Sequence, residues 1–182
     1  MEPKEILIQE ILQKEEAMFL AVRASEPSAC QDRVKTFRMM RKMSHWVLPE
    51  TVLESLLQDL VRAEYAGRNL MTEKYARMEN KISRARPHPL IVDIVNIEAQ
   101  WQEGLKKRYP LTFKGQGAGG DIYFACELET YSHETVELYY GALILALSET
   151  RNLVEERYTY LFSQLGYDSI DEMEKKQQAD TS

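Results

Sequence analysis

Residues 4–23 read KEILIQEILQKEEAMFLAVR, and the apolar residues of this segment recur every three or four positions. This spacing is typical of a helix with one buried face, because side chains three or four residues apart lie on the same side of a helix. The apolar stripe consists of Leu7, Ile8, Ile11, Leu12, Met18, Phe19 and Val22. The segment therefore predicts a first helix that packs against other helices.

The same periodicity continues along the chain, and proline and glycine residues interrupt it. We expect further helices over about 28–48, 50–66, 72–86, 90–109 and 122–162, the last with a cap or a kink at Ser132. No segment shows an alternation of apolar and polar residues long enough to build a sheet. The sequence predicts an all-α fold, an irregular bundle of roughly six to eight helices with no significant sheet.

Three residues are expected to mark helix ends. Ser28 precedes Gln31 by three positions, which is a capping-box pattern at the start of a helix. Thr72 is expected to cap the helix that follows it. Gly67 is expected to end the helix before it, because glycine adopts left-handed backbone without strain.

Length and charge limit the class of protein. We expect one helical domain over 1–170 and a polar tail over 171–182, since 182 residues suffice for one core. A net charge of -6 argues against a nucleic-acid partner. No apolar run approaches the roughly 20 residues that cross a bilayer, and the first residues lack the basic region of a signal peptide. We therefore expect a cytoplasmic protein without a membrane partner; a homo-oligomer is compatible with the sequence.

Several charged residues fall on apolar helix faces. Glu15 projects into the middle of the first stripe, and Arg41 shares a face with apolar residues of the second helix. Glu129 projects over the apolar residues that follow the glycine-rich segment, and Lys74 flanks the stripe that contains Tyr75. Because burying a lone charge is costly, we expect these groups to contact one another, water or a ligand.

Two interpretations follow. In the first, Glu15, Arg41 and Glu129 form a closed ion-pair network that only fixes helix packing. In the second, they surround a half-buried polar pocket, in which Arg41 and Lys74 bind an anionic group. Glu15 or Glu129 would then act as acid or base, and Tyr75 would supply a hydroxyl.

Four stretches of the chain resemble a bacterial family known as domain of unknown function 4125. They are EEAMF at 15–19, ACQD with TFRMMR at 29–32 and 36–41, GRNLMTEKYA at 67–76, and CELETYS at 126–132. Relative to the family pattern, this chain has Glu16 in place of tryptophan and His45 in place of glutamine. The resemblance implies a shared helical architecture and supplies no reaction. It also draws attention to polar residues of these stretches, namely Glu15, Cys30, Gln31, Arg38, Arg41, Arg68, Asn69, Glu73, Lys74, Tyr75, Glu127, Glu129, Thr130 and Tyr131.

Our functional hypothesis is a central pocket for a small anionic or zwitterionic molecule. The candidate catalytic residues are Glu15, Glu129 and Tyr75, and the candidate ligand-binding residues are Arg38, Arg41, Arg68, Asn69 and Lys74. The alternative is a non-catalytic interaction or scaffold module whose buried charges only fix helix packing. The sequence does not decide whether the protein is an enzyme and identifies no cofactor.

Other motifs carry less weight. The glycines of 115–120 lack the Lys-Ser/Thr and the preceding strand of a phosphate-binding loop. Glu15, Glu98 and Glu129 could be offered as di-iron ligands, but the chain has no Glu-x-x-His, so we expect no metal site. Cys30, near a helix start, could be an activated thiol; a packed, reduced thiol is the preferred interpretation for both Cys30 and Cys126.

Overall fold

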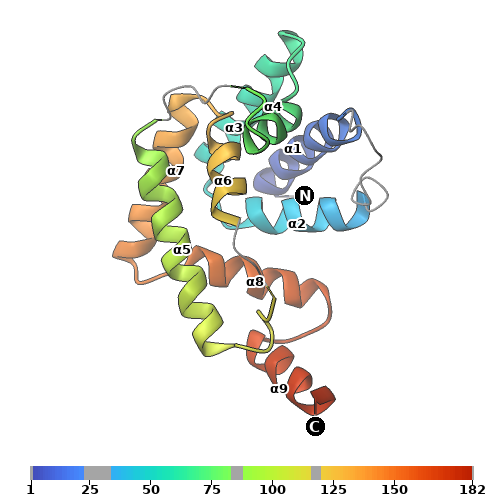
Figure 1. Cartoon of the computed structure of the whole chain (residues 1–182), viewed down its shortest axis with the longest axis vertical. Helices are drawn as coiled ribbons and strands as arrows, with labels where there is room; N and C mark the ends of the chain where they lie inside the picture. The colour runs from blue at the N-terminus through green and yellow to red at the C-terminus, as the bar shows by residue number, and fades with distance from the viewer. Residues whose placement is uncertain (1, 23–33, 83–87, 116–119, 182) are drawn as a thin grey trace.

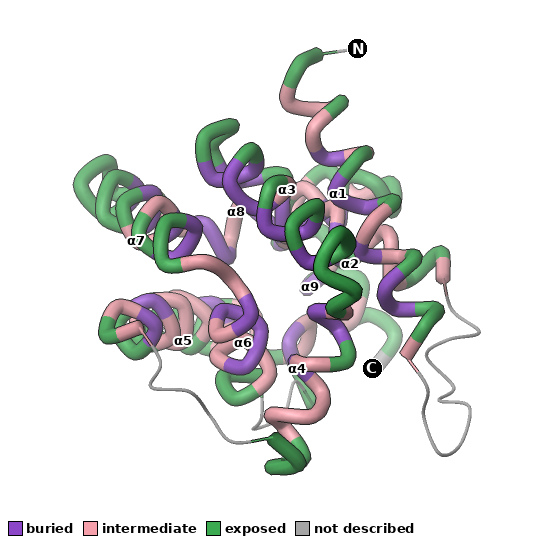
Figure 2. The backbone as a smooth tube through the Cα atoms, turned by 90° about the horizontal axis from the view of Figure 1, so that it is seen from above, coloured by how far each residue is buried: buried purple, intermediate pink, exposed green. Residues whose placement is uncertain are grey.

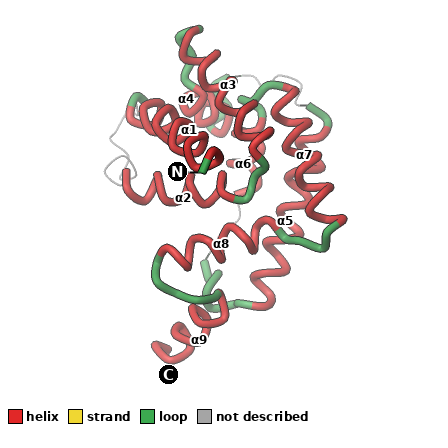
Figure 3. The backbone as a smooth tube through the Cα atoms, turned by 180° about the vertical axis from the view of Figure 1, so that it is seen from behind, coloured by secondary structure: helices red, strands yellow, loops and turns green. Residues whose placement is uncertain are grey.

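The computed structural model describes residues 2–22, 34–82, 88–115 and 120–181. These residues form nine helices and no strand. Figures 1 and 3 show how the helices are arranged. The helices are α1 (Pro3–Leu20), α2 (Val34–Trp46), α3 (Glu50–Tyr65), α4 (Leu70–Met78), α5 (Leu90–Arg108), α6 (Gly120–Leu128), α7 (His133–Ser148), α8 (Leu153–Gln164) and α9 (Ile170–Thr181). The all-α prediction is confirmed, but the expected six to eight helices is a slight undercount. None of the described helices is long and apolar enough to span a membrane.

The undercount arises in the last third of the chain. Ser132 caps α7 as expected, because its Oγ accepts from the Thr135 amide at 3.2 Å. A second interruption was not expected: Thr150 adopts a φ of 58°, and Asn152 caps α8 by accepting from the Glu155 amide at 3.0 Å. The segment predicted as a polar tail forms α9, and Glu174 of α9 accepts hydrogen bonds from the amides of residues 111 and 112.

The expected helix ends are confirmed at one position and wrong at another. Gly67 has a φ of +67°, and the next residue, Arg68, donates its amide to the Ala63 carbonyl, so glycine ends α3 as expected. The cap of α4 is Asn69, whose side chain accepts from the Thr72 amide at 2.9 Å. Thr72 is therefore the third residue of the helix and not its cap. The predicted cap at Ser28 and the thiol of Cys30 lie outside the described residues.

Most helices bury one face in a common core. Figure 2 shows buried and exposed residues alternating along the larger helices. The main core joins α1, α3, α4, α5, α6 and α7, with Leu53, Ile94 and Leu143 fully buried. A smaller core of Leu105, Phe113, Val154, Phe162 and Ile170 connects α5, α8 and α9. Figure 1 shows α6 lying between α5 and α4, both of which it contacts.

Asp59 ties α3 to the start of α7. Its Oδ2 accepts from the Ser132 amide at 2.9 Å, from Ser132 Oγ at 3.0 Å and from Thr135 Oγ1 at 2.6 Å. We expect Asp59→Asn to lower the free energy of unfolding by about 2 kcal/mol, because an amide cannot accept all three bonds as well as a carboxylate does. Urea unfolding of Asp59→Asn beside Asp93→Asn, an exposed aspartate of α5, tests this. Equal stability of the two variants would contradict it.

Candidate functional site

Seven polar side chains meet inside the bundle where α1, α2, α4 and α6 converge. We call them the core charge cluster, which consists of Glu15, Arg41, His45, Lys74, Tyr123, Glu127 and Tyr131. The four helices come from distant parts of the sequence. Each turns its apolar face toward the core, and this orientation places the seven side chains inside the bundle.

Arg41 of α2 holds Glu15 of α1 through two hydrogen bonds. Its Nε donates to Glu15 Oε2 at 2.9 Å, and its Nη2 donates to Oε1 at 2.5 Å. His45, one helical turn after Arg41, donates from Nε2 to the same Oε2 atom at 3.0 Å. Protein donors therefore occupy both oxygens of a carboxylate that is almost fully buried.

Glu127 of α6 has three partners. The Oε1 atom lies 2.8 Å from Arg41 Nη1 and accepts from the Tyr131 hydroxyl at 2.8 Å. The Oε2 atom accepts from Lys74 Nζ at 3.1 Å. Lys74 is only 1% exposed, and its Nζ also donates to the Tyr123 hydroxyl at 2.6 Å. Arg41 thus links the two carboxylates, and Lys74 extends the network to α4.

The two carboxylates stay ionised because of their partners. Burial alone would raise the pKa of Glu15, but the charges and hydrogen bonds of Arg41 and His45 outweigh it and lower this pKa to about 2. Burial likewise opposes ionisation of Glu127, but Arg41 and Lys74 hold its pKa well below the usual range. Both groups are therefore charged throughout the physiological pH range.

The core charge cluster leaves little free volume. The cavity between its members measures about 10 Å³, which is about the space that one water molecule requires. Two cations, Arg41 and Lys74, face two carboxylates, Glu15 and Glu127. The cluster is balanced in charge and closely packed in this conformation.

A second buried ion pair lies between α5 and α8. Arg157 donates to both carboxylate oxygens of Glu98, at 2.6 and 2.7 Å, and to the Tyr139 hydroxyl at 2.5 Å. Tyr139 in turn donates to Glu98 Oε1 at 2.7 Å. Burial would lower the pKa of Arg157, but Glu98 and Tyr139 keep it above the usual value. Only 8% of Arg157 is exposed, yet its Nε has no hydrogen-bond partner among the described residues.

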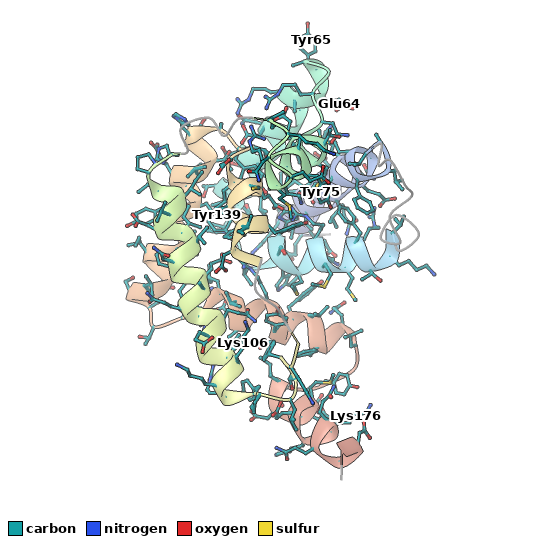
Figure 4. The ribbon with its side chains drawn as sticks, in the orientation of Figure 1. Glu64, Tyr65, Tyr75, Lys106, Tyr139 and Lys176 are labelled. Atoms are coloured by element: carbon teal, nitrogen blue, oxygen red, sulfur yellow. The ribbon has the colours of Figure 1, made fainter. Side chains whose placement is uncertain are left out.

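Arg157 and Glu98 line a cavity of about 340 Å³ between α2, α5, α6 and α8, which we call the α5 cavity. Its lining residues on α5 are Val95, Glu98, Ala99, Gln102 and Lys106. A second hollow, of about 600 Å³, adjoins it and shares Ala99, Gln102, Lys106 and Asp121. Figure 4 shows Lys106 on the half of α5 that lies toward α9, away from Tyr75. The α5 cavity and its adjoining hollow are larger than the cavity of the core charge cluster, and the sequence analysis did not predict them.

The carboxylates considered for a di-iron site lie in three different places. Glu15 belongs to the core charge cluster, Glu98 pairs with Arg157, and Glu129 Oε2 lies 3.6 Å from Arg77 Nε. Over the described ranges, no three His, Cys, Asp or Glu side chains converge as metal ligands would. Cys126 is a buried cysteine of α6.

One family match spans all the helices that carry these sites. The model of the family described as protein of unknown function (DUF4125) matches residues 5–175. The chain belongs to this family. The resemblance inferred from the sequence is thereby confirmed, and the family description assigns no activity. No curated protein and no solved structure matches the chain.

The structure brings together three of the eight predicted site residues of this family member. Glu15, Arg41 and Lys74 meet in the core charge cluster. Tyr75 lies at its edge: its ring centre is 6.5 Å from that of Tyr123, and the two side chains hydrogen-bond. Burial and the charge of Glu127 raise the pKa of Tyr123 to about 12 despite that hydrogen bond.

The other predicted residues lie elsewhere. Arg38 forms an ion pair with Glu16 at the surface of α1 and α2 and donates to Gln9 at 3.2 Å. Arg68 forms an ion pair with Glu73 near the start of α4, in which its Nε and Nη2 each donate to one Glu73 carboxylate oxygen at 2.8 Å. Asn69 caps α4 and also donates to the Met18 carbonyl at 2.8 Å. These contacts show that Arg38 and Arg68 belong to ion pairs and that Asn69 caps a helix.

Sequence reasoning placed the wrong glutamate of α6 in the cluster and missed a histidine. Glu127, which was not among the predicted site residues, contacts Arg41 and Lys74. Glu129 lies just beyond the end of α6, beside Arg77. His45 was also not among the predicted site residues, but it is buried and lies on the same helix face as Arg41, which precedes it by four residues. That spacing was the available signal.

Proposed function

We propose that this domain binds a small anionic or zwitterionic molecule and that the α5 cavity is the binding site. The observation that carries the proposal is the state of Arg157. Arg157 lines the cavity, is more than nine-tenths buried, and retains an Nε donor without a partner among the described residues. A buried donor left unsatisfied is costly, and a ligand acceptor in the cavity would remove that cost.

The dimensions and lining of the α5 cavity support the same proposal. Its volume, about 340 Å³, falls at the small end of the roughly 300–1,000 Å³ typical of ligand cavities. The lining combines apolar residues such as Val95 and Phe124 with a similar share of polar and charged ones, including Ser44 and Gln102. Ligand sites commonly combine an apolar wall with a few orienting polar groups.

In this proposal the core charge cluster has an architectural role. Its cations and carboxylates satisfy one another, and its free space holds about one water molecule. Ligand binding at Arg41 and Lys74, with Glu15, Glu129 or Tyr75 transferring protons, stays a prediction. It requires a ligand that takes over the contacts of Glu15 and Glu127.

Filling the cavity tests the assignment. We expect Ala99→Trp to abolish ligand-dependent thermal stabilisation in a screen of small metabolites, because the indole occupies the cavity without removing Glu98 or Arg157. Ala179→Trp, the same change at an exposed position of α9, is the matched control. Hits that stabilise both variants equally would place the ligand elsewhere; Glu15→Gln then tests the core charge cluster.

The alternative function is an interaction module. The observation in its favour is a row of exposed apolar side chains near the end of α7, namely Ile144, Leu145 and Leu147. A metabolite screen without hits, together with a stable oligomer in size-exclusion chromatography, would favour this alternative over ligand binding.

A further inference from the structure

We infer that the α5 cavity recognises a zwitterion with an apolar substituent, a molecule of the class and size of an apolar α-amino acid. This inference rests on the proposed function and names the chemical class of its ligand. It is carried by two opposite charges that line the same cavity, together with the apolar wall beside them.

The two charges are Lys106 of α5 and Asp121 of α6. Both line the α5 cavity and the adjoining hollow. Neither forms an ion pair or a hydrogen bond with any residue in the ranges that the structure describes. By contrast, the neighbouring pair Glu98 and Arg157 is closed on itself through two hydrogen bonds. Lys106 and Asp121 are therefore the charges available to a carboxylate and an ammonium group of one ligand.

Helix geometry separates the charged mouth of the cavity from its deeper end. Glu98, Gln102 and Lys106 lie four residues apart on one face of α5, which puts Glu98 about 12 Å from Lys106 along the helix axis. Lys106 is half-buried and Asp121 is exposed, whereas Arg157 is buried. The free charges thus stand at the open end, and the closed ion pair stands at the buried end.

Apolar residues line the cavity at both of these ends. Phe124 follows Asp121 by one helical turn at the open end, and Val95 precedes Glu98 by one turn at the buried end. Val154, on α8, is buried beside them. A zwitterion whose charged groups bind Lys106 and Asp121 would place its substituent against these apolar residues. The Arg157 Nε donor is available to a polar atom of a longer substituent.

The balance of charge argues against a polyanion. The lining contains two cations, Lys106 and Arg157, and two carboxylates, Glu98 and Asp121. A phosphate or a dicarboxylate would meet Asp121 without compensation, and like charges in a partly dehydrated site repel. A zwitterion meets one charge of each sign.

The test compares ligands that differ by one charge. Isothermal titration calorimetry of the full chain would measure the apolar amino acids from L-alanine to L-phenylalanine. Each is matched with the amine that lacks the carboxylate and the acid that lacks the ammonium group; for L-leucine these are isoamylamine and isocaproate. We expect at least one amino acid to bind about tenfold more tightly than both of its analogues, since the removal of one charged group from the ligand weakens binding by about that factor.

Two variants assign the charges. We expect Lys106→Met to remove the preference for the amino acid over its amine, and Asp121→Asn to remove the preference over its acid. The matched controls are Lys175→Met and Asp180→Asn, which replace an exposed lysine and an exposed aspartate of α9. Both controls should retain the full preference.

The outcomes separate this inference from the proposed function. Isocaproate or isoamylamine binding as tightly as leucine, or cavity ligands that carry charge of one sign only, would overturn the zwitterion assignment and leave ligand binding intact. The zwitterion assignment would likewise be overturned, and ligand binding retained, if no amino acid binds but other compounds bind the wild-type protein and not Ala99→Trp. The absence of any ligand would overturn both.

Discussion

Arg41→Met is expected to lower the free energy of unfolding by about 3–5 kcal/mol. The arginine is the common partner of Glu15 and Glu127. Its removal leaves two buried carboxylates facing each other with fewer partners, which is the costliest way to break a buried ion pair. Urea unfolding followed by far-ultraviolet circular dichroism would measure the loss.

The matched control is Arg38→Met, three residues earlier on α2. Arg38 pairs with Glu16 but is partly exposed, so its removal should cost at most about 1 kcal/mol. Adding Glu15→Gln and Glu127→Gln to Arg41→Met should recover part of the lost stability, because the stranded charges are then gone. An Arg41→Met protein as stable as wild type that no longer responds to ligand would instead identify the core charge cluster as the binding site.

Acid should destabilise the protein through the same carboxylates. The pKa of Glu15 is about 2 in the folded state, against 4.5 for an unperturbed glutamate. A lowered folded-state pKa stabilises the protein above the unfolded-state value, and this stabilisation disappears as the pH falls through the folded-state pKa. Glu15 alone should account for about 3 kcal/mol between these two pH values. The pKa of Glu127 is lowered too, so the stability that Glu127 contributes is also lost as the pH falls through this range and below it.

Unfolding free energies measured at intervals between about pH 5 and about pH 2 would reveal this dependence. In Glu15→Gln the curve should start lower and fall less steeply, whereas Glu54→Gln, at an exposed position of α3, should follow wild type. Identical slopes for wild type and Glu15→Gln would show that Glu15 is not the titrating group.

The sequence predicts the fold class and the burial of three charges correctly because both depend on local periodicity. Glu15 and Arg41 occupy the interior of their apolar stripes, and a stripe of seven apolar residues fixes the helix orientation well. Lys74 follows from the same pattern. Long periodic helices average out errors at their ends.

Residues near helix ends and contacts between distant helices are harder to predict. The projection of α6 fails because it takes the face of Ile122 as buried. Ile122 is exposed, and the buried residues of α6 are Cys126, Glu127 and Leu128. The break at Thr150 depends on a left-handed residue that carries no glycine signal. Glu98 and Arg157 lie on helices 59 residues apart in sequence, and no local pattern indicates that they pair or that a cavity adjoins them.

The α6 helix contributes residues both to the core charge cluster and to the α5 cavity, and these two sets of residues differ in how freely they can be substituted. Tyr123 and Glu127 join the core charge cluster, while Asp121 and Phe124 line the α5 cavity. Replacement of one charged residue of the core charge cluster leaves an opposite charge without its partner. Substitutions in the cluster that keep the protein stable therefore change both partners together. Glu98 and Arg157 of the α5 cavity depend on each other in the same way. Lys106, Asp121 and the apolar lining positions of this cavity carry no such interdependence. Ligand preference can therefore diverge by single substitutions while the scaffold stays constant.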